Sequence, residues 1–212
     1  MPIKKESKVF QKELKTKMKT KMKTKSIMKK LLLLSTIAMF SMANSINAQN
    51  VDVGFKAGLN ISNLTGGDAD RNNLLDFHVG ALAEFKITEK ISLQPELLYT
   101  RQGSEPQDSL KIKLDYLAIP LMVKYHVSKK FSLEAGPQLS FLVNDKAEFN
   151  DSSIPDADVD ASSFDFGLNV GFAYNINSNL FAQVRYNYGV TTVVENPDIK
   201  NSVFQISLGY KL

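Results

Sequence analysis

The stretch VDVGFKAGLNIS, Val51–Ser62, alternates apolar residues with polar residues or glycine at every position. A period of two places successive side chains on opposite faces of a β-strand, whereas an amphipathic helix needs a period of 3.6. One face of this stretch is wholly apolar, and the other carries lysine, aspartate, asparagine, serine and two glycines. The stretch therefore predicts a β-strand whose two faces meet different surroundings.

Seven further segments alternate in the same way: 75–87, 91–101, 111–127, 131–143, 164–176, 180–190 and 203–212. The alternation slips within 111–127, and a β-bulge near Asp115–Tyr116 would absorb the slip. Three connections are tight: 88–90, 128–130 and 177–179. Four are long and polar: 63–74, 102–110, 144–163 and 191–202. Short connections at one end and long ones at the other predict an all-β, eight-stranded, antiparallel up-and-down barrel.

Glycine and tyrosine indicate which face points inward. Eight of the eleven glycines fall on the polar face of the predicted strands: Gly54, Gly58, Gly80, Gly136, Gly167, Gly171, Gly189 and Gly209. Small residues are useful inside a narrow eight-stranded barrel, where large side chains fill the space. Six of the seven tyrosines lie on the apolar face near strand ends, as in the aromatic girdles of membrane barrels. We expect a transmembrane barrel; a soluble β-sandwich and a soluble barrel with an apolar cavity remain alternatives.

Three prolines conflict with a closed barrel. Pro95, Pro120 and Pro137 lie within predicted strands, where proline cannot donate to the ladder. We expect local bulges or strand-end positions at these residues.

The first 48 residues have the order of a secretory signal. Residues 1–30 hold 12 Lys and 2 Glu, and subtracting this +10 from the chain's +4 leaves −6 for residues 49–212. Leu31–Ala43 is apolar but spans only about 20 Å as a helix, too short for a hydrocarbon core of about 30 Å. We predict a cleavable signal peptide in residues 1–48, cut between Ala48 and Gln49, with Met28 as an alternative start. A permanent anchor and a nucleic-acid-binding arm are the alternatives.

Several stretches resemble the porin-like, PorT-type outer-membrane β-barrel family of Bacteroidetes-type bacteria. They are LDYLAIPLMVKY (Leu114–Tyr125), LEAGPQLSFLV (Leu133–Val143), FDFGLNVGFAYNI (Phe164–Ile176) and RYNYGV (Arg185–Val190), with GFKAGLNIS (Gly54–Ser62) fitting the first strand. The resemblance spans Val51–Leu212 and implies an eight-stranded barrel in the outer membrane. It also implies prolines at Pro120 and Pro137, and it supplies no catalytic residues.

Charged residues are numerous on the face predicted to point inward. Burying a charge without a partner is costly, so these residues should be paired. We expect Glu96 and Glu134 to accept from Lys124 and Arg185, all near mid-strand. The simplest interpretation is a structural plug of ion pairs; a proton or solute pathway is the alternative.

No catalytic, cofactor or metal residues are predicted. His78 follows Asp76 on one face near the long-loop end, but no serine stands out as a nucleophile. The run Asp156-x-Asp158-x-Asp160 starts like a calcium loop, yet Ala161 and Gly167 occupy the positions that require Gly and Glu.

The expected protein is therefore an outer-membrane barrel of a Gram-negative bacterium with a side-chain-filled interior. We expect a structural or surface-interaction role through four long extracellular loops. The alternatives are a narrow channel for small solutes and a lipid-modifying enzyme. The expected partners are outer-membrane lipid and the outer-membrane assembly machinery, with no nucleic acid, and we expect a monomer.

Overall fold

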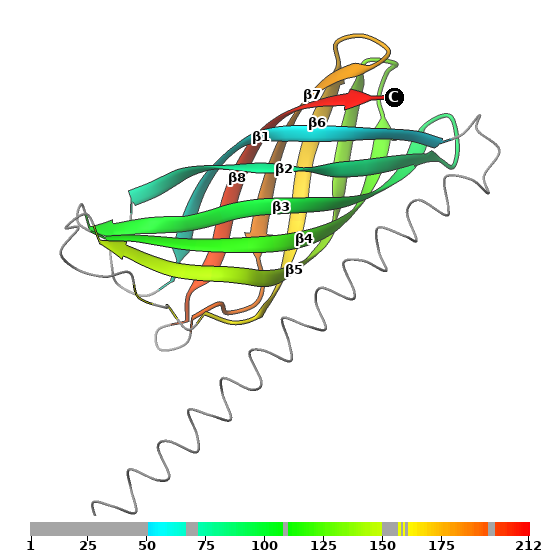
Figure 1. The fold of residues 1–212 in the computed structure, drawn as a ribbon. Helices are drawn as coiled ribbons and strands as arrows, with labels where there is room; N and C mark the ends of the chain where they lie inside the picture. The colour runs from blue at the N-terminus through cyan, green and yellow to red at the C-terminus, as the bar shows by residue number, and fades with distance from the viewer. Residues whose placement is uncertain are drawn as a thin grey trace, which may run out of the picture. The chain divides into compact units, whose positions relative to one another are not determined.

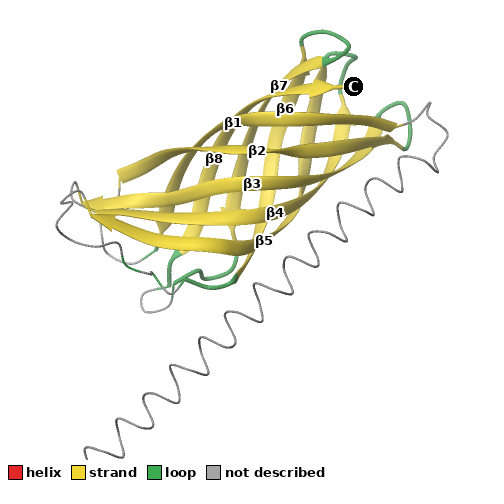
Figure 2. Cartoon of the chain, viewed as in Figure 1, coloured by secondary structure: helices red, strands yellow, loops and turns green. Residues whose placement is uncertain are grey.

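Eight antiparallel strands close into a barrel in which each strand pairs with the next and β8 pairs back to β1 (Figures 1 and 2). The computed structural model describes residues 51–66, 72–107, 110–149, 157, 159, 161–194 and 198–212. The strands are β1 (Val51–Thr65), β2 (Asn72–Lys86), β3 (Ile91–Gln107), β4 (Leu110–His126), β5 (Phe131–Phe149), β6 (Phe164–Asn175), β7 (Leu180–Gly189) and β8 (Lys200–Lys211). The predicted eight-stranded barrel is confirmed, whereas the predicted cut at Ala48–Gln49 lies outside the described residues. Within the described part, no helix has the length and apolar character to cross a membrane.

Alternation along the strands places apolar side chains outside and polar ones inside. Phe55, Leu59 and Val170 are each more than half exposed. The polar residues between them, such as Asn60 and Asn169, are buried in the barrel. A large apolar outer surface on a closed barrel is what a lipid environment requires. The interior is not wholly polar, because Leu82, Leu98, Met122 and Phe181 are also buried there.

Inward-facing glycines make room for large side chains on neighbouring strands. A Cβ atom on Gly209 would overlap the ring of Phe181, which lies opposite it on β7. A Cβ atom on Gly58 would crowd the ring of His78. The missing side chain is thus used for packing, as a filled narrow barrel requires.

The tyrosines also divide as expected. Tyr125, Tyr174 and Tyr210 are exposed near the short-turn end, and Tyr186 and Tyr188 are exposed near the long-loop end. Tyr99 is only half-buried and lies within β3, because that strand runs on to Gln107. Tyr116, the seventh tyrosine, is fully buried in the interior.

The three strand prolines interrupt the ladders without changing their register. The β2–β3 pairs skip residues 94–95, the β3–β4 pairs skip 119–120, and the β4–β5 pairs skip 136–137. The same register resumes beyond each gap, so the expected bulges or strand-end positions at Pro95, Pro120 and Pro137 were wrong. A proline removes one N–H donor, and the pairs on either side suffice to hold the register.

The predicted bulge is present, because the β4–β5 register shifts between Asp115 and Tyr116. Several strands run further than expected at the long-loop end, and β3 and β5 do so by six residues each. The segment Gln102–Leu110 was predicted as a long loop, but β3 continues to Gln107 and β4 begins at Leu110. Ion pairs such as Lys113–Glu148, at 2.6 Å, join neighbouring strands in this extension. The alternation of apolar and polar residues therefore no longer identifies a strand where both of its faces meet polar surroundings.

Candidate functional site: the filled barrel interior

A balanced cluster of two cations and two carboxylates occupies the middle of the barrel. Arg185 on β7 donates to both oxygens of Glu96 on β3, at 2.8 and 2.9 Å, and to Glu134 on β5, at 2.8 Å. Lys56 on β1 lies 2.7 Å from Glu96. Gln183 links Lys56 to Glu134. Its side-chain oxygen accepts from the Lys56 ammonium group at 2.7 Å, and its amide nitrogen donates to Glu134 at 2.8 Å. All five side chains are almost fully buried, so four strands are cross-linked through the barrel centre.

Three of the four residues predicted to form this network lie together, but Lys124 does not. Lys124 stands directly across from Glu134 in the β4–β5 register. Its ammonium group nevertheless donates to Glu84 and Gln94, each at 3.0 Å. The predicted pairing of Lys124 with Glu96 or Glu134 was wrong because Arg185, Gln183 and Lys56 already occupy those carboxylates.

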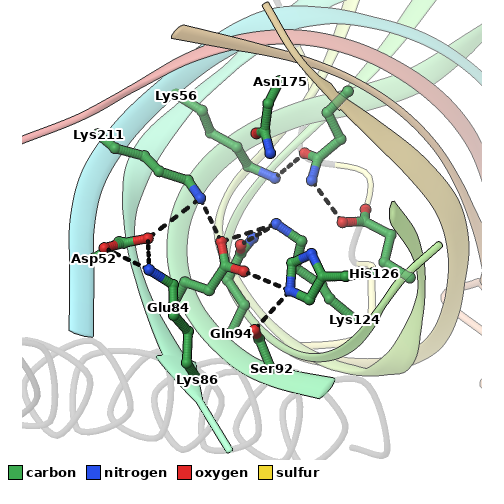
Figure 3. A network of polar contacts seen from close by, with 12 residues as sticks. Asp52, Lys56, Glu84, Lys86, Ser92, Gln94, Lys124, His126, Asn175 and Lys211 are labelled. Carbon is green, nitrogen blue, oxygen red and sulfur yellow. Dashed lines mark hydrogen bonds and ion pairs between the residues drawn. The ribbon is translucent and has the colours of Figure 1, made fainter. Parts of the chain in front are cut away.

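A second cluster lies at the short-turn end and is drawn in Figure 3. The buried Glu84 carboxylate accepts from Lys124 at 3.0 Å and Lys211 at 2.7 Å, and it lies 3.2 Å from His126. Asp52 pairs with Lys86 at 3.1 Å and Lys211 at 3.6 Å. The ring of Phe181 lies 6.0 Å from the ammonium groups of both Lys124 and Lys211. Lys211 lies on the polar face of the predicted last strand, but it was not among the expected network residues because its partner Glu84 is 127 residues away in the sequence.

Gln94 connects the two clusters. Its side-chain oxygen accepts from Lys124 at 3.0 Å, and its amide nitrogen donates to Glu96 at 2.6 Å. The barrel therefore holds one continuous polar network from its centre to its short-turn end.

Apolar side chains are buried together in the interior near the long-loop end. Leu64, Leu114, Tyr116, Val193 and Ile199 form a buried cluster, of which Val193 and Ile199 come from the connection between β7 and β8. That connection folds back on itself, because the Val193 N–H donates to the Ile199 carbonyl at 2.7 Å. Among the described residues, apolar packing thus fills the interior near this end of the barrel.

His78 has polar partners, but Asp76 is not among those found. One ring nitrogen lies 2.8 Å from Asn60 Oδ1, and the other lies 2.7 Å from Ser207 Oγ. The amide nitrogen of Asn60 donates to the backbone carbonyl of Arg101 at 2.6 Å, so its oxygen faces the histidine and receives the ring N–H. The free ring nitrogen then accepts from Ser207. This serine was not found from the sequence, since only the register shows that Gly58 lies between Ser207 and His78.

The hydrogen-bonded chain of Ser207, His78 and Asn60 resembles a nucleophile with its base, but it is buried away from any substrate. His78, Asn60 and Ser207 are each at most 2% exposed. Within the described ranges, no group of three or more His, Asp or Glu side chains is placed to hold a metal ion. The calcium-like acidic run at 156–160 falls mostly outside those ranges. The arrangement as a whole is suited to filling and bracing a barrel.

The comparisons with known proteins agree with this geometry. Residues 47–195 match the family described as the outer membrane protein beta-barrel domain. The chain belongs to this outer membrane β-barrel family. Membership indicates an outer-membrane location and explains the apolar outer face. No curated protein matched the chain.

Solved structures with a similar fold include two bacterial proteins. Neisserial surface protein A is 15% identical, with 76% of this chain and 97% of that chain covered and a TM-score of 0.55. Ail of Yersinia pestis, in complex with the heparin analogue sucrose octasulfate, is 14% identical, with 77% and 100% covered and a TM-score of 0.50. At these identities the likeness concerns the fold alone.

Proposed function

We infer that this outer membrane β-barrel does not conduct solutes and serves a structural or surface-interaction role. The observation that carries this proposal is the filled interior. Three layers of side chains follow one another along the barrel: the apolar cluster, the Arg185 cluster and the Glu84 cluster. A channel for small solutes, the alternative, would need these layers to part.

The proposed orientation places the short turns and the C-terminus in the periplasm and the long-loop end outside the cell. Short periplasmic turns and longer extracellular connections are the rule in outer-membrane barrels. The surface offered to the outside then includes a ribbon of extended strand, formed by residues 102–107 of β3, 110–114 of β4 and 145–149 of β5. The connections after β1, β5 and β7 belong to the same surface. This revises the expectation of four long loops, because residues 108–109 alone separate β3 from β4.

The finer relationship to the PorT-type barrels of Bacteroidetes-type bacteria is also proposed. It is supported by Tyr116–Pro120 and by the Gly136-Pro137 pair, which coincide with two of the three ladder interruptions. We further propose a monomer that is inserted by the outer-membrane assembly machinery, since the barrel is closed and has no free edge along its paired strands.

Single-channel recording in planar lipid bilayers tests the proposal. We expect no stable unit conductance from the folded chain. A matched control is Glu96→Ala with Arg185→Ala, which removes side chains from the central layer while leaving the outer face intact. Stable conductance from the unaltered chain would overturn the proposal in favour of a narrow channel.

The lipid-modifying alternative has its own measurement. Substituting His78 by Ala breaks the chain of contacts between Ser207 and Asn60. We expect the lipid A composition of cells to be the same with the unaltered chain and with the variant. A difference would support the enzyme instead.

A further inference from the structure

The three tight turns at the short-turn end share one construction. Each has an aliphatic residue, then Thr, Ser or Asn, then two residues, then an apolar residue: Ile87–Ile91, Val127–Phe131 and Ile176–Leu180. The side-chain oxygen of the second residue accepts from two backbone N–H groups further along the turn. For Thr88 these belong to Lys90 and Ile91, at 3.2 and 3.0 Å. Ser128 and Asn177 make the equivalent pairs of bonds.

These bonds fix the backbone of the turns and so fix where their third and fourth residues point. In the first two turns these residues include Lys90, Lys129 and Lys130, whereas the third turn has the uncharged Ser178 and Asn179. The first two turns flank β3 and β4, and the His126 N–H donates to the Lys90 carbonyl at 2.8 Å. The lysines therefore gather over one side of the rim.

The three lysines are exposed, and none forms an ion pair with any residue that the structure describes. The other lysines of this end behave differently, since Lys86 and Lys211 are paired with Asp52 or Glu84. Glu89 is the acidic residue within these two turns, so their net charge is +2.

Apolar residues border the lysines on the outer face of the barrel. Ile87 is 63% exposed and Val127 is 56% exposed, and each begins one of the two basic turns. On a membrane barrel such residues meet acyl chains, so the adjacent ammonium groups lie at the level of the lipid phosphates.

From this juxtaposition we propose that the rim formed by Lys90, Lys129 and Lys130, with Ile87 and Val127, binds anionic phospholipid headgroups of the periplasmic leaflet. Each ammonium group contributes Coulomb attraction to a phosphate, and the aliphatic side chains contact the first carbons of the acyl chains. The assignment to the periplasmic leaflet rests on the orientation given under the proposed function. The preference for anionic lipid does not, because it is a property of the rim.

Native mass spectrometry of the full chain, folded in detergent and titrated with lipid, tests the proposal. The probes are phosphatidylglycerol and zwitterionic phosphatidylcholine with the same acyl chains. We expect tighter binding of phosphatidylglycerol. At about 1 kcal/mol for each lysine, K90Q, K129Q and K130Q should each weaken that binding roughly fivefold, and the triple variant roughly 100-fold.

The matched control is the triple variant K111Q/K146Q/K200Q, which removes the same charge from the long-loop end. It should bind phosphatidylglycerol like the unaltered chain, and a heat-modifiable gel shift shows that each variant is folded. If the triple variant of the rim lysines does not fold, the three single variants test the same expectation. Equal binding of the two lipids, or an equal loss in the control triple, would overturn the proposal. Conductance is measured in a separate experiment. A negative lipid-binding result would therefore not contradict the proposal that the barrel does not conduct solutes.

Discussion

The outer face and the interior of the barrel are built from the same strands but obey different rules. On the outer face, a residue such as Val170 is exposed and contacts lipid, so any apolar side chain of moderate size would serve there. In the interior, Arg185 has defined partners on two other strands, and no other residue type can reproduce its three bonds. The outer face therefore requires only apolar side chains at alternate positions, whereas the interior requires particular hydrogen-bonding atoms at particular positions.

The largest effect should follow from breaking the central cluster. Arg185→Ala leaves Glu96 and Glu134 buried with only Lys56 as a cation, and removing one partner of a buried pair costs about 3–5 kcal/mol. Urea unfolding in lipid vesicles measures this loss. The neighbouring outward residue provides the control, and Val184→Ala should cost much less. Equal losses would remove the distinction between the two faces.

A charge on the outer face should be nearly as harmful. Val170→Arg, at mid-strand, should cost about 2–4 kcal/mol of folding free energy in the membrane. Asn169→Arg, one residue away, meets a full interior in which Asn169 already bonds to Gln138 and Asn187, so its cost should come from crowding. Vesicle folding titrations measure both. The facing assignment fails if both variants fold as well as the unaltered chain.

Crowding alone can be tested at an interior glycine. Gly209→Ala directs a methyl group into the ring of Phe181, and overpacking of this kind costs about 1–3 kcal/mol. Adding Phe181→Leu should restore part of the stability, which the same unfolding titrations would detect. If the double variant is no more stable than Gly209→Ala alone, the Phe181 ring is not the obstacle.

The smallest effect should come from the ribbon beyond the barrel. Lys113→Gln breaks a part-exposed pair with Glu148, and such pairs contribute about 0.2–1 kcal/mol. Salt should diminish the difference between the two proteins. A double-mutant cycle with Glu148→Gln isolates the coupling. A coupling as large as that of the central cluster would mean that this region resembles the interior.

The sequence predicted the parts of the fold that repeat. Alternation along the chain located all eight strands, and the glycines and tyrosines indicated which face turns inward. The errors occurred where the sequence departs from the repeat. Pro95, Pro120 and Pro137 suggested bulges, but the neighbouring pairs kept the register. The loop expected at 102–110 is mostly strand, because alternation weakens once both faces are polar.

In the interior, the sequence indicated which residues would be buried and charged, and it brought Glu96, Glu134 and Arg185 into one group. It could not assign Lys124 to Glu84, or identify Ser207 and Asn60 as the partners of His78. A strand's period of two is a local property, set by each backbone unit, and can be read from a short stretch. Partners across a closed barrel belong to strands far apart in the chain, and long side chains reach past their ladder neighbours. Only the closed tertiary structure decides which of them meet.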